Sequence, residues 1–148
     1  MRFDIKKLGF INFATAVVLV SAIEVSLILA GAVSPLSELS AANAFFSFLT
    51  LAILYSMGWR FSDDKLNESA RKGAVSMFAA FLVVIVGVFI GRSVQKPVLG
   101  VYAPSESALY MLLLVNLLVN VVIGAIIVSA GAFFARMMKK QAKKRAKK

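Results

Sequence analysis

The sequence predicts an all-α polytopic membrane protein, a bundle of four transmembrane helices. Of its 148 residues, 60% are hydrophobic, and they are grouped in four long blocks instead of being spread along the chain. The blocks span residues 8–33, 41–58, 73–91 and 108–135. A helix needs about 20 consecutive apolar residues to cross the hydrocarbon core of a bilayer. Transmembrane barrels are excluded, because their strands alternate in polarity and are only about 10 residues long.

The first block, 8–33, is interpreted as a membrane span that is retained in the protein. Ala30, Gly31 and Ala32 resemble the small-residue cleavage site of a signal peptide, which leaves cleavage as an alternative. The apolar stretch before them is longer than the roughly 7 to 15 residues of a signal peptide, and it contains Glu24. Because it also exceeds the thickness of the bilayer, we expect this span to tilt.

Turn and capping residues separate the other blocks. Ser40 directly precedes the second block and is typical of a helix cap. The segment 60–72 predicts a helical turn that is capped by Ser62 and runs into the third block. The connection 92–107 is expected to be irregular because it contains two prolines and a glycine, and Ser105 is the expected cap of the fourth helix. We therefore expect one transmembrane domain over 1–135, followed by a basic tail over 136–148.

Basic residues are distributed unequally between the two ends of the expected bundle. Of the 17 Lys and Arg residues, 15 lie before the first block, between the second and third, or after the fourth. The two loops on the other side hold only Arg92 and Lys96. Loops that are rich in Lys and Arg remain in the cytoplasm. The sequence therefore predicts a multi-pass protein of the cell membrane with both termini in the cytoplasm.

The basic tail predicts contact with lipid headgroups. Near an anionic leaflet each Lys or Arg contributes about 1 kcal/mol of attraction. We expect this contact from Lys139, Lys140, Lys143, Lys144 and Arg145. RNA is the alternative partner, but the tail has no aromatic residue and no recognisable nucleic-acid fold, so no specific nucleic acid is expected. The expected partners are the bilayer, anionic lipids at its cytoplasmic face, and other membrane subunits or further copies of the chain.

The composition also argues against catalysis. The chain contains neither Cys nor His. It therefore lacks thiol nucleophiles, haem ligands, most transition-metal ligands and the commonest general base. We expect no metal site, no cofactor and no catalytic residue, and we predict that the chain is not an enzyme.

Glu24 is the only ionisable residue well inside an expected span. A carboxyl group there is costly, so it is expected to face the bundle interior and to be protonated. Asn116 and Asn120 share one face of the fourth span at a similar depth, and we expect Glu24 to point toward one of them.

Two roles for Glu24 remain open. It is either a proton- or cation-coupling site on a path that water reaches, or a neutral structural acid that is hydrogen-bonded in a dry interior. Asn116 and Asn120 need not contact Glu24. The alternative is that their side chains form hydrogen bonds to nearby backbone or to another subunit, as intramembrane Asn side chains also do.

Small residues predict a close contact between the first and third spans. Ala22 and Ser26 are four residues apart on the first span, and Gly87 and Gly91 have the same spacing on the third. Small residues at this spacing let two helix backbones approach each other. We therefore expect these two spans to touch through these four residues.

Three short stretches resemble the GtrA-like family of small four-span membrane proteins. They are Gly-Ala-Val-Ser-Pro-Leu at 31–36, Ala-Asn-Ala-Phe at 42–45, and Trp-Arg-Phe at 59–61. The resemblance covers about the first 60 residues and implies a role in moving polyprenyl-phosphate-linked sugars across the membrane. The sequence departs from the family at 56–58, where Ser-Met-Gly replaces the usual Asn and Arg, and its second half lacks another Trp-x-Phe motif.

The sequence therefore supports two classes of function. The first is an accessory, scaffold or assembly subunit of a larger membrane complex, which acts by helix packing. The alternative is a small transporter, either of a polyprenyl-phosphate-linked sugar or of a cation or proton through Glu24. A pore-forming lysis protein with a basic tail is a third interpretation. A transporter needs Glu24 on a wet path, whereas a scaffold needs it dry and bonded.

Overall fold

The computed structural model describes residues 5–100 and 105–145, and within these residues the regular structure is entirely helical. The helices are α1 (Ile5–Ala30), α2 (Ala41–Arg60), α3 (Leu66–Ser93) and α4 (Glu106–Arg145). Each is long and apolar enough to cross a membrane. The predicted all-α bundle of four membrane-spanning helices is therefore confirmed.

The helices do not end where the apolar blocks end. Helix α1 stops at Ala30, since Gly31 takes a positive φ of 80°, a conformation that commonly terminates helices. Helix α3 begins seven residues before the predicted span, and α4 continues through most of the basic tail to Arg145. Charged residues continue a helix as readily as apolar ones, so hydropathy marks the bilayer and not the helix. At 40 residues, α4 is about 60 Å long, roughly twice the thickness of the hydrocarbon core.

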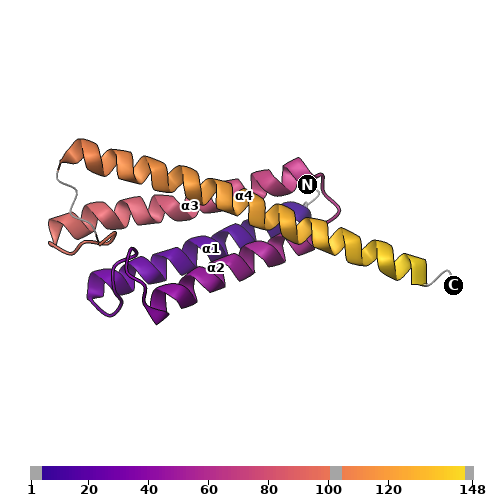
Figure 1. The fold of residues 1–148 in the computed structure, drawn as a ribbon, viewed down its shortest axis with the longest axis horizontal. Coiled ribbons are helices and arrows are strands. Elements are labelled where there is room, and N and C mark those ends of the chain that lie inside the picture. The colour runs from indigo at the N-terminus through magenta and orange to yellow at the C-terminus, as the bar shows by residue number, and fades with distance from the viewer. Residues whose placement is uncertain (1–4, 101–104, 146–148) are drawn as a thin grey trace.

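The bundle has two different ends (Figure 1). One end, called the terminal end, holds the start of α1, the α2–α3 connection and the side from which α4 extends. The other, called the two-loop end, holds the α1–α2 and α3–α4 connections. Helices α1 and α4 each pack against both α2 and α3 but, within the described residues, not against each other. Helix α1 stays against α3 as far as the two-loop end, where Val25 and Leu29 lie beside Gly87 and Gly91.

Glycines bring α4 into backbone contact with two helices. At the α2–α4 crossing, a Cβ added to Gly58 would collide with the Val128 carbonyl, and one added to Gly131 would collide with the α2 backbone. The α3–α4 crossing repeats this arrangement, with Gly73 against the carbonyl of Gly124. Such close approach strengthens packing between membrane helices.

The contact between α1 and α3 differs in detail from the predicted one. The two helices pack together, and both Gly87 and Gly91 are buried. However, Gly87 faces the side chain of Val25, while Ser26 is exposed and Ala22 is only half-buried. Gly87 on α3 therefore packs against a larger side chain of α1. The reason is that α1 turns Val25 toward α3, instead of the neighbouring Ser26 and the Ala22 on the same face as Ser26.

A polar cluster joins the α2–α3 connection to α3 and α4. This terminal cluster consists of Ser62, Asp63, Asp64, Lys72, Arg136 and Lys139. The Arg136 Nε donates to the Ser62 carbonyl at 2.6 Å, and its Nη2 donates to the Asp64 carbonyl. The Lys139 Nζ lies 2.8 Å from the Ser62 Oγ and 2.9 Å from a carboxylate oxygen of Asp63, and Lys72 forms an ion pair with Asp64.

Ser62 therefore does not have its predicted role. The N-cap of α3 is Lys65, whose side chain makes no capping hydrogen bond. Ser62 is instead buried, at 1% exposure, and its hydroxyl accepts the hydrogen bond from Lys139. A capping interpretation from local sequence fails here because a residue 77 positions away competes for the same hydroxyl.

The two-loop end is fixed by caps that the sequence indicates. The Ser40 hydroxyl accepts from the Asn43 backbone N–H at 3.1 Å, and the Ser105 hydroxyl accepts from the N–H three residues later at 3.2 Å. The buried Asn43 amide also donates to the carbonyls of Pro35 at 2.8 Å and Glu38 at 2.9 Å. These bonds hold the α1–α2 loop over the ends of the helices.

Candidate functional site

A cavity of about 470 Å³ lies among the four helices and reaches both loops of the two-loop end. Its apolar walls come mainly from α3, through residues such as Met77, Phe81 and Val84. Its polar lining consists of Ser21, Glu24, Ser37, Ser47, Thr50, Asn116 and Asn120. The cavity therefore combines a hydrophobic wall with one carboxyl group and several uncharged hydrogen-bonding groups.

Glu24 lies on the cavity surface in a half-buried position. Within the described part of the chain, its carboxyl group has no hydrogen-bond or ion-pair partner. It is also the only ionisable residue among those that line the cavity. The described residues therefore do not supply the hydrogen bond that a structural acid at this position would need.

Asn116 and Asn120 share the cavity with Glu24 but are bonded within their own helix. The Asn116 amide donates to the Leu112 carbonyl at 2.9 Å, and the Asn120 amide donates to the Asn116 carbonyl at 2.8 Å. These are the backbone bonds that the sequence left open as an alternative. The structure thus brings the three predicted residues to one cavity, while no hydrogen bond among the described residues joins Glu24 to either Asn.

Helix contacts close the cavity on two sides, and it reaches the surface between α2 and α4. The α1–α3 seam is filled where the Val25 side chain meets Gly87. Toward the terminal end, the backbone contact at Gly58 closes α2 against α4. Between the outer parts of these two helices, Leu51 and Ile123 both line the cavity and are each 39% exposed on the surface. The cavity therefore opens sideways between α2 and α4, toward the membrane.

Sequence reasoning missed four of the polar residues in the lining, which are Ser21, Ser37, Ser47 and Thr50. Ser21 precedes Glu24 by three residues on α1, and Ser47 precedes Thr50 by three on α2. Side chains three residues apart share one helix face. This spacing was the available signal, but Ser and Thr are common in membrane spans and do not stand out as a carboxyl group does.

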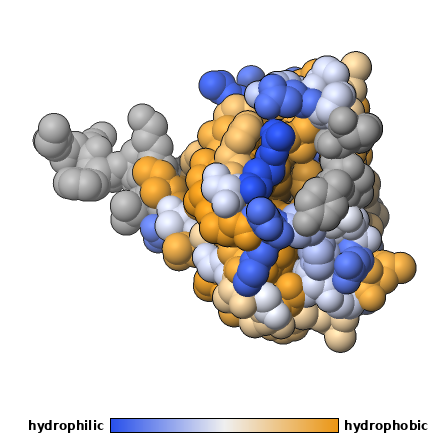
Figure 2. Space-filling model, turned by 90° about the vertical axis from the view of Figure 1, so that its left-hand side faces the viewer, coloured by the Kyte–Doolittle hydropathy of each residue, from blue (hydrophilic) through white to orange (hydrophobic). Residues whose placement is uncertain are grey.

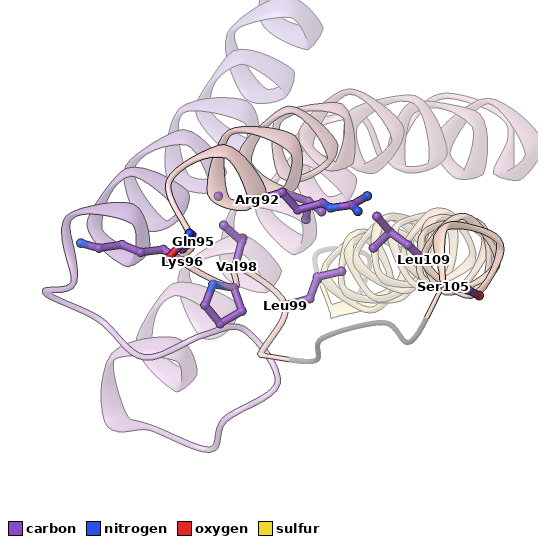
Figure 3. A pocket seen from close by; sticks show the side chains of 10 residues that line it. Arg92, Gln95, Lys96, Val98, Leu99, Ser105 and Leu109 are labelled. Carbon is purple, nitrogen blue, oxygen red and sulfur yellow. The ribbon is translucent and has the colours of Figure 1, made fainter.

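A second pocket, of about 340 Å³, lies between the end of α3 and the start of α4 (Figure 3). Arg92 and Lys96 both line it, but their side chains point in opposite directions. The Lys96 Nζ donates to the Leu29 carbonyl at the end of α1 at 2.8 Å, and an Arg92 Nη2 lies 4.0 Å from a Glu106 carboxylate oxygen. The two positive charges therefore do not converge on one point.

The surface of the two-loop end is mixed in character. Figure 2, which looks onto this end, shows hydrophilic residues gathered in a strip across the middle and hydrophobic residues along the sides. This pattern is expected where the ends of membrane helices meet water while their sides meet lipid.

The basic residues near the end of α4 fall into two groups. Lys139 belongs to the terminal cluster, but its side chain is still 55% exposed, so its expected contact with headgroups stays a prediction. Lys140, Lys143 and Arg145 are exposed on the helix beyond the bundle. The side chain of Lys144 lies outside the described part of the structure. The exposed group remains free to meet a charged surface.

The fold and the cavity define a class of protein: a small integral membrane protein of four helices, with a cavity between them that is lined by both polar and apolar side chains. No family model matches the chain, and neither a curated protein nor a solved structure is significantly similar to it. The resemblance to the GtrA-like family therefore stays a prediction, and a function has to be argued from the geometry.

Proposed function

We propose that this chain is a non-enzymatic membrane transporter that exchanges a proton for a cationic solute at Glu24. The observation that carries the proposal is the carboxyl group of Glu24, which has no partner among the described residues and lines a cavity of about 470 Å³. Intramembrane carboxyl groups are costly, and they commonly mark ion pathways and proton relays. A proton or a cation at this group removes the cost of an unpaired charge.

The asymmetry of the bundle fits a carrier that opens to one side at a time. The cavity reaches the two-loop end, while glycine contacts and the terminal cluster close the other end. Many small transporters bind their substrate near the middle of the membrane and expose the site to each side in turn. In this proposal the structure corresponds to a state that is closed at the terminal end.

A scaffold subunit is the second candidate, and the surface of α4 favours it. The apolar segment of α4 is the least buried of the four spans. Exposed side chains such as Leu114, Leu118 and Ile126 follow one another along it. In a scaffold, a neighbouring subunit would cover this face, whereas in a transporter lipid would cover it.

A polyprenyl-phosphate-linked sugar is an alternative substrate, as the family resemblance implies. Hydroxyl and carboxamide groups in the cavity lining suit sugar hydroxyls. Among the described residues, however, no Lys or Arg lines this cavity to hold the phosphate. The charge of the lining therefore favours a cation.

We further propose that the terminal end lies in the cytoplasm and that Lys140, Lys143 and Arg145 contact anionic lipids there. Cysteines introduced in place of Ser37 and Gln141 should react with a membrane-impermeant maleimide from opposite sides of the membrane. Ser37 is in the α1–α2 loop, and Gln141 lies beyond the bundle on α4. The natural chain contains no Cys, so no background labelling is expected. Labelling of both sites from one side would overturn this topology.

Glu24→Gln should abolish exchange while leaving the fold intact, because Gln keeps the size and polarity of Glu but cannot release a proton. Purified protein would be reconstituted into vesicles that contain a pH-sensitive dye. Inward gradients of sodium, potassium and tetramethylammonium would be applied in turn, and the cation that is transported should raise the internal pH with the natural chain, since each entering cation expels a proton.

The control for this experiment is Glu38→Gln, which neutralises an exposed carboxyl group in the α1–α2 loop that does not line the cavity. It should retain full exchange. A Glu24→Gln protein that exchanges protons as the natural chain does would refute the transport proposal. If that variant also kept a stable partner during mild purification from native membranes, the scaffold function would be favoured.

A further inference from the structure

We infer that the cavity takes an amphipathic organic cation, which enters sideways from the membrane between α2 and α4. This inference rests on the proposed function and specifies the substrate class of the same site. It depends on three features of the cavity: its charge, its apolar wall and the position of its opening.

The charge of the lining selects a cation. Glu24 is the only ionisable residue that lines the cavity, and the other polar groups there are neutral hydroxyls and carboxamides. An ionised carboxyl group in such a place lacks a counter-charge, and an unpaired charge away from bulk water is strongly unfavourable. A ligand with a positive charge supplies what the protein itself does not, whereas an anion would be repelled.

The apolar wall selects an organic ligand over a bare metal ion. Met77, Ala80, Phe81 and Val84 of α3 form one wall of the cavity. These side chains offer no oxygen ligands to a metal ion, but they can pack against the apolar groups of an organic cation that pairs with Glu24. The volume of about 470 Å³ falls in the range of roughly 300–1,000 Å³ typical of sites for organic molecules.

The opening selects a ligand that dissolves in the membrane. Leu51 and Ile123 stand at the mouth between α2 and α4, and both are partly exposed on a surface that lipid covers. On the opposite side, Val25 against Gly87 closes the cavity. A ligand with apolar groups concentrates in the bilayer, and the mouth admits it directly from there.

Binding should displace a proton from Glu24. The protonated carboxyl group loses H⁺, the carboxylate pairs with the cation, and the net charge of the site is unchanged. The residues that face Glu24 across the cavity do not titrate: Ser47 and Thr50 on α2, the apolar wall on α3, and Asn116 and Asn120 on α4. The charged residues at the two-loop end, Glu38, Arg92, Lys96 and Glu106, do not line the cavity. Affinity should therefore rise with pH through Glu24 alone.

The test measures binding of tetraphenylphosphonium, a lipophilic cation, to the purified full-length protein by titration calorimetry. Glu24→Gln should weaken binding by at least about tenfold, because the ion pair is lost. Ile123→Trp should also weaken it by narrowing the mouth. Leu118→Trp is the matched control, since Leu118 is exposed on the same helix but does not line the cavity. This control should bind as the natural chain does.

Two comparisons decide the outcome. Neutral triphenylphosphine oxide should not compete, and the binding heat should change with the ionisation enthalpy of the buffer, which reports the released proton. Equal affinity of the natural chain and Glu24→Gln for tetraphenylphosphonium would overturn the inference. If the vesicle experiment showed Glu24-dependent exchange of tetramethylammonium while tetraphenylphosphonium did not bind, the proposed function would stand and this substrate class would be wrong.

Discussion

Gly58→Ala is expected to destabilise the protein, although alanine normally stabilises a helix by about 1 kcal/mol relative to glycine. The added methyl group would collide with the Val128 carbonyl and approach the Ala132 nitrogen to 3.0 Å. Both obstacles are backbone atoms of α4, which cannot move aside as a flexible side chain can. Overpacking of this kind costs about 1–3 kcal/mol, and the effect should lie at the upper end of that range.

The measurement is the thermal unfolding of the purified protein in detergent, followed by loss of helical signal or by aggregation. Gly9→Ala provides the control within α1, because a Cβ there would lie 3.4 Å from the nearest atom of the Phe61 ring, an ordinary contact. This variant should be unchanged or slightly more stable. If both alanine variants gained stability equally, the close backbone crossing of α2 and α4 would be incorrect.

Arg136→Gln should release the α2–α3 connection from α4. The guanidinium group donates to two backbone carbonyls, those of Ser62 and Asp64, and hydrogen bonds that involve a charged group contribute about 1.5–3 kcal/mol each. Glutamine is shorter and cannot reach both acceptors. We expect a loss of roughly 2–4 kcal/mol in unfolding free energy and faster proteolysis within 61–65.

The control for this variant is Arg145→Gln, which removes the same charge from an exposed position on the same helix. It should leave both unfolding and proteolysis unchanged, because surface charges contribute little to stability. Equal behaviour of the two variants would show that the hydrogen bonds of Arg136 to the Ser62 and Asp64 carbonyls add no stability beyond that of a surface charge. In that case the terminal cluster would not hold the end of the bundle together.

The number and class of the helices could be predicted because the membrane allows little choice. A long apolar segment in lipid must satisfy its own backbone hydrogen bonds, so it forms a helix. The ends of the helices could not be predicted in the same way. The charged residues after Leu66 continue α3 outside the apolar block, and those after Arg136 continue α4. Hydropathy therefore located the membrane but not the full helices.

The candidate site was predictable only where a residue is rare in its surroundings. Glu24 stands out because a carboxyl group is unusual in a span, and Asn116 and Asn120 stand out for a similar reason. The bond between Arg136 and the α2–α3 loop joins residues more than 70 positions apart. Nothing in the local sequence marks such a pair, so the sequence showed only an excess of positive charge at this end.

The uninterrupted course of α4 links two regions that have separate chemistry. One part of the helix presents Asn116 and Asn120 to the cavity. Its middle crosses α3 at Gly124 and α2 at Gly131, and its far end is strongly basic. A rigid helix that turns about those glycines behaves as a lever. With a rise of about 1.5 Å per residue, a rotation of about 10° about Gly131 would displace Arg145 by about 4 Å. Any ligand that spreads the cavity walls would thus also shift the basic end of α4 across the facing membrane surface.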